Sequence, residues 1–278
     1  MGCCSSEPRL PSEAILLNRI KTSIESNNPE RLASYFLVYE NYPNPTNIPL
    51  IDKIIVTIKS TSFTSLSYAL WLGHVKIFRY LYEKKFASVL VMEEGFKASG
   101  MSGLEIICQR GFRDMFDYYM PIFIEKYPSL SFPKDSLTIV QKICEAGNLS
   151  MLSAIISYFA DKKDIPEQLD IHYQNPDTNE NCALVACKTA NIVIIKYLAN
   201  ECKADFTKKT SNGKNAIDLI CTSGKPNSVY LSCAEFLIKG SYTQIPEKIE
   251  DNDLNKLVIK INQEIMTNYL KEQSVENN

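Results

Sequence analysis

The chain has 278 residues, of which 45% are apolar and 22% are charged, and its formal net charge is −2. These values are ordinary for a globular protein and lie outside the disordered range. The near balance of charge gives no general attraction to nucleic acid, so we expect no nucleic-acid partner. The sequence contains no run of 18 apolar residues and no secretory signal, and a membrane-spanning helix is therefore not expected.

The first residues match a lipidation signal. Gly2 and Ser6 satisfy the pattern M-G-x-x-x-[ST], in which the glycine α-amine is myristoylated after Met1 is removed. One myristoyl chain gives reversible attachment, with a partition constant around 10⁴ M⁻¹, so stable anchoring needs a second signal. Basic residues nearby are too sparse to supply it. The adjacent Cys3 and Cys4 are therefore the expected second signal, through S-palmitoylation.

Residues 1–13 are accordingly predicted to be a lipid-anchor segment, acylated on Gly2, Cys3 and Cys4, that holds the protein at a membrane surface. Pro8 and Pro11 indicate a short spacer before the first helix. The alternative is an unmodified N-terminal segment with exposed thiols.

A helix-pair pattern recurs from Ala14 to Gly240. Its clearest copy is segment 64–81, which begins TSLSYA, turns at Gly73-His74 and continues with apolar residues at helical spacing. Other copies turn at Gly111, Gly147 and Ala190. A small residue permits a tight turn, and the apolar residues around it are expected to face the neighbouring pair.

This pattern resembles the ankyrin consensus T-P-L-H-x-A…G-H…V-V…L-L. The resemblance implies an all-α, ankyrin-like α-solenoid of about five to six helix-pair repeats over residues 14–240, with a surface for recognising a protein. The alternative is an ordinary α-helical domain in which the pattern arises by chance.

The spacing of the repeats indicates insertions. The turn positions 28, 73, 111, 147 and 190 are 45, 38, 36 and 43 residues apart, whereas the family period is about 33. We therefore predict three insertions, with loops rich in proline or polar residues in the first and third: Tyr42–Leu50, Val89–Met101 and Asp161–Asn181.

Apart from the N-terminal pair, the nine cysteines are scattered. The sequence has no C-x-x-C and no histidine at ligand spacing, so we expect neither a metal site nor a disulfide framework. Four cysteines fall at or beside the small position of the first helix, where the ankyrin consensus has alanine, and we predict that they are buried, reduced and outside disulfides: Cys108, Cys144, Cys187 and Cys221.

Catalytic signals are absent from the sequence. His74 at the consensus turn and His172 in a predicted loop lie far apart, and they supply no general base for a serine or cysteine nucleophile. The glycine-rich phosphate-binding motifs G-x-G-x-x-G and G-x-x-x-x-G-K-[ST] are both absent from the sequence. We therefore expect no enzymatic activity, no catalytic residue and no cofactor.

In ankyrin folds, partner contacts usually come from the tips of inter-repeat loops and from the concave helix surface. By position in the repeat, the predicted partner-binding residues are Tyr173, Gln174, Lys208, Lys209 and Asn212. The alternative for each is a solvated loop residue. Two other tyrosines near loops are predicted, like Tyr173, to be exposed anchors: Tyr39 and Tyr42.

Residues 241–278 are predicted to be a connector and an amphipathic C-terminal helix. A solenoid needs a polar outer face at each end, so we expect this helix to cap the stack. The alternative is a free helix for a partner or a dimer. Its apolar stripe follows helical spacing and comprises Leu254, Leu257, Val258, Ile261, Ile265 and Tyr269.

These features favour a membrane-tethered, non-enzymatic ankyrin-repeat adaptor at the cytoplasmic face of a membrane, with the plasma membrane the expected one. Its expected partners are a protein and, through the acyl chains, a membrane surface. The alternative is a soluble regulatory or inhibitory subunit that binds and controls an enzyme.

Overall fold

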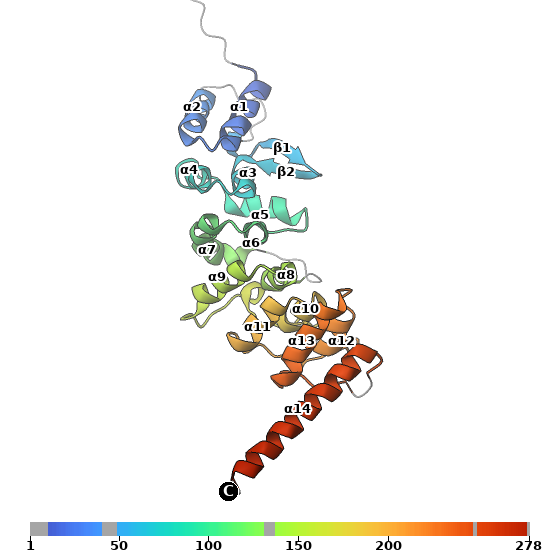
Figure 1. The fold of residues 1–278 in the computed structure, drawn as a ribbon. Coiled ribbons are helices and arrows are strands. Elements are labelled where there is room, and N and C mark those ends of the chain that lie inside the picture. The colour runs from blue at the N-terminus through green and yellow to red at the C-terminus, as the bar shows by residue number, and fades with distance from the viewer. Residues whose placement is uncertain (1–10, 41–48, 131–136, 247–248, 277–278) are drawn as a thin grey trace, which may run out of the picture. The chain divides into compact units, whose positions relative to one another are not determined.

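The computed structural model describes residues 11–40, 49–130, 137–246 and 249–276 (Figure 1). The chain divides into two compact units, Met1–Lys134 and Asp135–Asn278. Within the described ranges the regular structure is 14 α-helices, three short 3-10 helices (Leu50–Asp52, Tyr127–Ser129 and Glu167–Leu169) and one two-stranded sheet, so the predicted helical class is confirmed. No helix in these ranges is long and apolar enough to cross a membrane.

The first unit is built from antiparallel helix pairs. The pairs are α1 with α2, α3 with α4, and α6 with α7, and the first helix of each packs on the first helix of the next. Its helices and strands are α1 (Glu13–Glu25), α2 (Pro29–Glu40), β1 (Ile54–Ile58), β2 (Thr61–Thr64), α3 (Ser65–Leu72), α4 (Val75–Lys85), α5 (Val89–Lys97), α6 (Gly103–Arg110) and α7 (Arg113–Lys126).

The second unit repeats this arrangement. α8 pairs with α9, α10 with α11, and α12 with α13, while α8, α10 and α12 pack in series. Its helices are α8 (Ile139–Ala146), α9 (Leu149–Phe159), α10 (Cys182–Lys188), α11 (Ile192–Asn200), α12 (Ala216–Cys221), α13 (Asn227–Lys239) and α14 (Asn252–Glu276).

Three of the pairs turn on a left-handed glycine, as predicted. Gly73, Gly111 and Gly147 follow α3, α6 and α8 with φ of 75°, 70° and 74°. In each turn the glycine N–H and the next N–H bond back to two carbonyls of the preceding helix. These two hydrogen bonds give partners to carbonyl groups at the helix end that have none within the helix. The same turn therefore recurs in both units.

The glycines at positions 73 and 147 also leave room for the turn of the next pair. A Cβ atom on Gly73 would lie 2.8 Å from the Phe112 ring, and one on Gly147 would lie 2.3 Å from the Asn191 side chain. At Gly111 nothing lies within 4 Å of that point. Stacking of successive turns thus requires glycine at two of the three positions for steric as well as conformational reasons.

A β-hairpin precedes α3 and was not expected from the pattern. β1 and β2 are antiparallel, with Ile58 opposite Thr61. The two residues between the strands, Lys59 and Ser60, both have positive φ, which is the geometry of a hairpin turn whose twist matches the strands. The run IIVTI is rich in β-branched residues that favour a strand, and Phe63 of β2 is fully buried.

Most of the predicted insertion at Val89–Met101, whose form the sequence pattern left open, is the helix α5 (Val89–Lys97). The Ser88 hydroxyl accepts a hydrogen bond from the Val91 N–H at 3.3 Å and caps its first turn. Met92 and Phe96 are buried, and α5 packs against β2, α3 and α6. The hairpin and α5 thus pack on each other and on α3.

Three of the four predicted cysteines are fully buried: Cys108, Cys144 and Cys187. None of the cysteines in the described ranges forms a disulfide. The prediction was wrong for Cys221, which is only half-buried. This residue ends α12 in the last helix pair, so no further first helix packs over it.

The first half of α14 packs on the last helix pair. Leu254, Val258 and Ile261 are buried, and α14 contacts α13. The Tyr230 hydroxyl donates to Asp251 at 2.8 Å, and Lys239 lies 3.0 Å from Glu264. These contacts agree with a capping helix of the second unit.

The predicted stripe is buried over only part of its length. Leu257 is half-buried, and the Ile265 side chain is 53% exposed. The last turns of α14 extend beyond α13 in Figure 1, which agrees with the exposure of Ile265.

The turn geometry predicts different costs for two glycine substitutions. Gly73→Ala should destabilise the first unit by about 2–4 kcal/mol, because left-handed strain adds to the clash with Phe112. Gly111→Ala, at nearly the same φ but with open space, should cost only about 1–2 kcal/mol. Urea denaturation of both variants measures the difference, and equal costs would contradict the proposed stacking of turns.

The packing of α14 predicts a second contrast. Ile261→Ala should lower the free energy of unfolding by about 2–4 kcal/mol, because Ile261 is 1% exposed. The matched control, Ile265→Ala one turn later, should stay within about 0.5 kcal/mol of the wild type. Thermal and urea unfolding check both values. A large effect at Ile265 would mean that another surface covers it.

Candidate functional site

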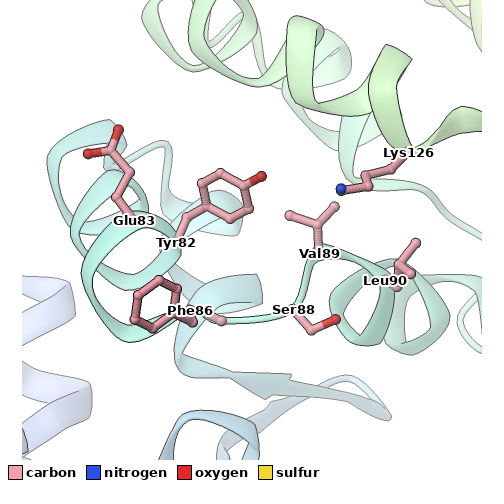
Figure 2. Close-up of a pocket in the computed structure, with 8 residues that line it drawn as sticks. Tyr82, Glu83, Phe86, Ser88, Val89, Leu90 and Lys126 are labelled. Atoms are coloured by element: carbon pink, nitrogen blue, oxygen red, sulfur yellow. The ribbon is translucent and has the colours of Figure 1, made fainter.

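An open groove of about 600 Å³ lies in the first unit, between the end of α4, the start of α5 and the end of α7 (Figure 2). In Figure 2, the Tyr82 ring and Val89 face each other across the hollow, and the Lys126 amine reaches in from α7. The residues that line it are Tyr82, Glu83, Phe86, Ala87, Ser88, Val89, Leu90 and Lys126.

Phe86 forms one edge of the groove in an unusual backbone conformation. It follows α4 with φ of 55° and ψ of 34°, and the Ala87 N–H donates to the Leu81 carbonyl at 3.1 Å. Glycine is the residue that usually occupies this left-handed position after a helix. A bulky side chain there is a true outlier, because its Cβ crowds the backbone.

The Phe86 side chain is also 85% exposed. Leu90, which also lines the hollow, and its neighbour Val91 are 38% and 47% exposed on the first turn of α5. Phe86 therefore departs from local preference twice, in its conformation and in its exposure. Departures of this kind are expected where a residue serves function rather than folding, and a contiguous exposed apolar surface is typical of an interaction site.

Opposite charges stand on the two walls. On α4, Glu83 accepts a hydrogen bond from the Tyr118 hydroxyl at 2.9 Å and lies 3.8 Å from Arg79. Burial, and then the Glu83 carboxylate, raise the pKa of Tyr118 to about 12. On α7, Lys126 pairs with its chain neighbour Glu125 at 2.5 Å.

The Tyr82 hydroxyl has no hydrogen-bond partner in the part of the chain that the structure describes. Its ring stacks on Phe78, with centroids 6.4 Å apart. The Ser88 hydroxyl is engaged in capping α5, and none of the residues lining the groove is a cysteine or a histidine. The groove therefore offers apolar contact, two charges and a hydroxyl, a set suited to binding.

A buried carboxylate holds the α5 wall in place. Glu93 is 6% exposed, and both of its oxygens accept the Gly103 N–H, at 2.9 and 3.2 Å. It also accepts a hydrogen bond from the Tyr119 hydroxyl. Burial raises the pKa of this carboxyl, while the two donors lower it in part. Because Glu93 lies one turn after Val89, its bonds to α6 and α7 set the position of the groove wall.

The two loops that carry the predicted partner-binding residues lie side by side in the second unit. The Ser211 N–H donates to the Thr178 carbonyl at 2.8 Å, and the Asn181 amide donates to the Asp205 carbonyl at 2.8 Å. Residues 170–181 and 205–215 are thus joined at two points, although a long stretch of sequence separates them. The predicted residues therefore lie on two loops that are hydrogen-bonded to each other.

Their exposure differs, however. Lys208, Lys209 and Asn212 are exposed, and Lys208 lies 3.8 Å from Asp205. Tyr173 and Gln174 are half-buried. The Gln174 amide donates to the Asn179 carbonyl at 3.1 Å, so that side chain stabilises its own loop.

The remaining predicted site residues are those of the lipidation signal and the tyrosines expected to be exposed. Gly2, Cys3 and Cys4 lie outside the described residues, as does Tyr42. The prediction of an exposed Tyr39 was wrong, because it is 8% exposed and Lys53 lies 5.7 Å from its ring centroid.

The two histidines lie in different units and in different surroundings. His74 precedes α4 in the turn, where burial lowers its pKa, and His172 is an exposed loop residue. Within the described part of the chain, no three His, Cys, Asp or Glu residues form a group able to hold a metal ion.

Comparison with known proteins gives no family. The sequence matches no protein-family model, and no curated protein matches it. The likeness to ankyrin repeats therefore rests on the residue pattern and on the recurrent turn.

The conformation of Phe86 predicts an unusual stability effect. Phe86→Gly should leave stability unchanged or raise it by about 1 kcal/mol, because glycine accepts the left-handed conformation and little packing is lost. As the control, Lys84→Gly inside α4 should destabilise by about 1 kcal/mol. Chemical denaturation compares the two, and a clear loss of stability in Phe86→Gly would show that the ring supports the fold.

Proposed function

We propose that this protein is a non-enzymatic adaptor built on ankyrin-like repeats and held at the cytoplasmic face of a membrane, the plasma membrane, by acyl chains on Gly2, Cys3 and Cys4. The observation that carries the adaptor part is the turn shared by Gly73, Gly111 and Gly147. It has the same hydrogen bonds at the same place in three helix pairs. Stacked pairs of this kind serve as extended surfaces for protein partners.

The exposed surfaces support a binding role. The groove beside Phe86 leaves a large aromatic ring in solvent, and the loop between α11 and α12 presents the polar side chains of Lys208, Lys209 and Asn212. Aromatic side chains dominate the energetics of protein interfaces, and polar residues form the rim. Each surface belongs to one unit, so each can act independently of the other.

The membrane part of the proposal rests on how two weak signals combine. A myristoyl chain on Gly2 supplies a first, reversible encounter with the bilayer. Cys3 and Cys4 are then at the membrane surface, where a second acyl chain makes the attachment lasting. A protein partner bound to the repeats would in this way be concentrated at the membrane.

The lipid proposal is tested by comparing three variants in the native cell. Gly2→Ala should abolish incorporation of a myristate analogue and move the protein to the soluble fraction. Cys3→Ser with Cys4→Ser should keep the myristoyl chain but make binding weak and reversible. The matched control, Ser5→Ala, leaves Gly2, Ser6 and both cysteines in place and should behave like the wild type.

The intact mass of the wild-type protein decides between the membrane-tethered adaptor and the alternative, a soluble regulatory subunit. An added mass equal to one myristoyl group, with or without palmitoyl groups, supports the adaptor. A wholly soluble protein without N-terminal lipid would leave the soluble regulatory subunit, with the same repeat surfaces controlling an enzyme.

A further inference from the structure

We infer that the groove beside Phe86 binds an extended peptide segment of a protein partner, with one large apolar side chain of that segment in the hollow and an acidic residue beside Lys126. This inference rests on the proposed protein-binding function and adds to it a site and the chemistry of the partner. It is carried by the position of Phe86, by the shape of the groove and by the charges on its walls.

Phe86 is the natural anchor of the contact. Folding does not account for a phenylalanine at a left-handed position where its ring is 85% exposed. A bound apolar side chain would cover that ring. Removing the apolar surface of the ring from water, which does not happen on folding, would then contribute to the free energy of binding. Aromatic residues at the edge of a pocket are frequent hot spots of protein interfaces.

The extent of the apolar surface favours a peptide chain over a compact small molecule. The hollow between Tyr82 and Val89 is open on one side (Figure 2), whereas small-molecule sites usually enclose most of the ligand. Leu90, which lines the hollow, and Val91, which follows it in the first turn of α5, are also exposed. An open hollow with exposed apolar residues at its edge fits a segment of peptide chain that continues past it.

The charges select an acidic residue near α7. Glu83 is already held by the Tyr118 hydroxyl and faces Arg79. Lys126, by contrast, pairs with an adjacent glutamate whose side chain is 65% exposed, a weak kind of ion pair that a ligand can replace. A carboxylate of the peptide would meet the Lys126 amine where it enters the hollow in Figure 2.

The Tyr82 hydroxyl adds a polar contact for the peptide backbone. It belongs to a residue that lines the hollow and has no hydrogen-bond partner among the residues described. An extended segment has unpaired backbone N–H and C=O groups, and a hydroxyl can donate to one or accept from the other.

The test selects binders from a phage-displayed library of random short peptides on the immobilised full-length protein. We expect the enriched peptides to share one large apolar residue with an aspartate or glutamate a few positions away. A synthetic consensus peptide should bind the wild type and bind Phe86→Gly at least about tenfold more weakly. Ile15→Ala, which changes an exposed apolar residue of α1, is the control and should keep the wild-type affinity.

A charge reversal tests the position of the acid. Lys126→Glu should weaken binding of the consensus peptide and favour a version in which its acidic residue is replaced by lysine. If the acidic and the lysine-containing peptide each bind the wild type and Lys126→Glu equally well, the peptide's acidic residue does not lie beside Lys126, and that assignment is overturned. Circular dichroism of each variant verifies that the helices are retained.

Two outcomes would contradict peptide binding in the groove without deciding whether the protein is a membrane-tethered adaptor. If the selected peptides bind Phe86→Gly as tightly as the wild type, they occupy another surface, so protein binding stands and the groove proposal fails. If no peptide is enriched over an unrelated immobilised protein, the groove proposal also fails. Lipid analysis of Gly2 then judges the membrane-tethered adaptor separately.

Discussion

The tight turn within each helix pair is the constraint on which the packing in both units depends. Gly73, Gly111 and Gly147 take a conformation that other residues reach only with strain, and two backbone hydrogen bonds close the preceding helix at each of them. The turn reverses the chain within two residues, so the second helix packs directly on the first. Where Phe112 lies against Gly73, and Asn191 against Gly147, the turn also sets the distance to the next pair.

An interruption of the repeat creates the most distinctive surface. Between the pairs α3–α4 and α6–α7, the chain inserts α5, which must be fastened to its neighbours without the turn that fastens the pairs. Glu93 does this through Gly103 and Tyr119, at the cost of burying a carboxylate that only its hydrogen bonds offset. Three residues link α4 to α5, and the first of them, Phe86, takes the left-handed conformation. The groove is thus a consequence of the insertion.

The helix pairs provide most of the stability, whereas the inserted segments and loops provide the surfaces proposed for recognition. The helix pairs bury Cys108, Cys144, Cys187 and most large apolar side chains, and substitution of these residues is expected to change stability first. The inserted segments and loops carry the exposed residues, from Phe86 and Leu90 to Lys208 and Lys209. Such segments tolerate change while a rigid scaffold holds them in place, which is why binding residues concentrate there.

The sequence by itself determined the helical class, the turn glycines, the burial of Cys108, Cys144 and Cys187, and the start of the packed face of α14. These follow from local rules, because φ at a glycine and the period of an apolar stripe depend on residues near one another in the chain. Only the tertiary structure decided the hairpin, the helical form of α5, the exposure of Phe86 and the half-burial of Cys221. The exposure of Phe86 and the half-burial of Cys221 depend on which distant segments cover a side chain. The hairpin and α5 have local signals of their own, but they are short and are held by packing on α1, α3 and α6, which a single sequence does not contain in local form.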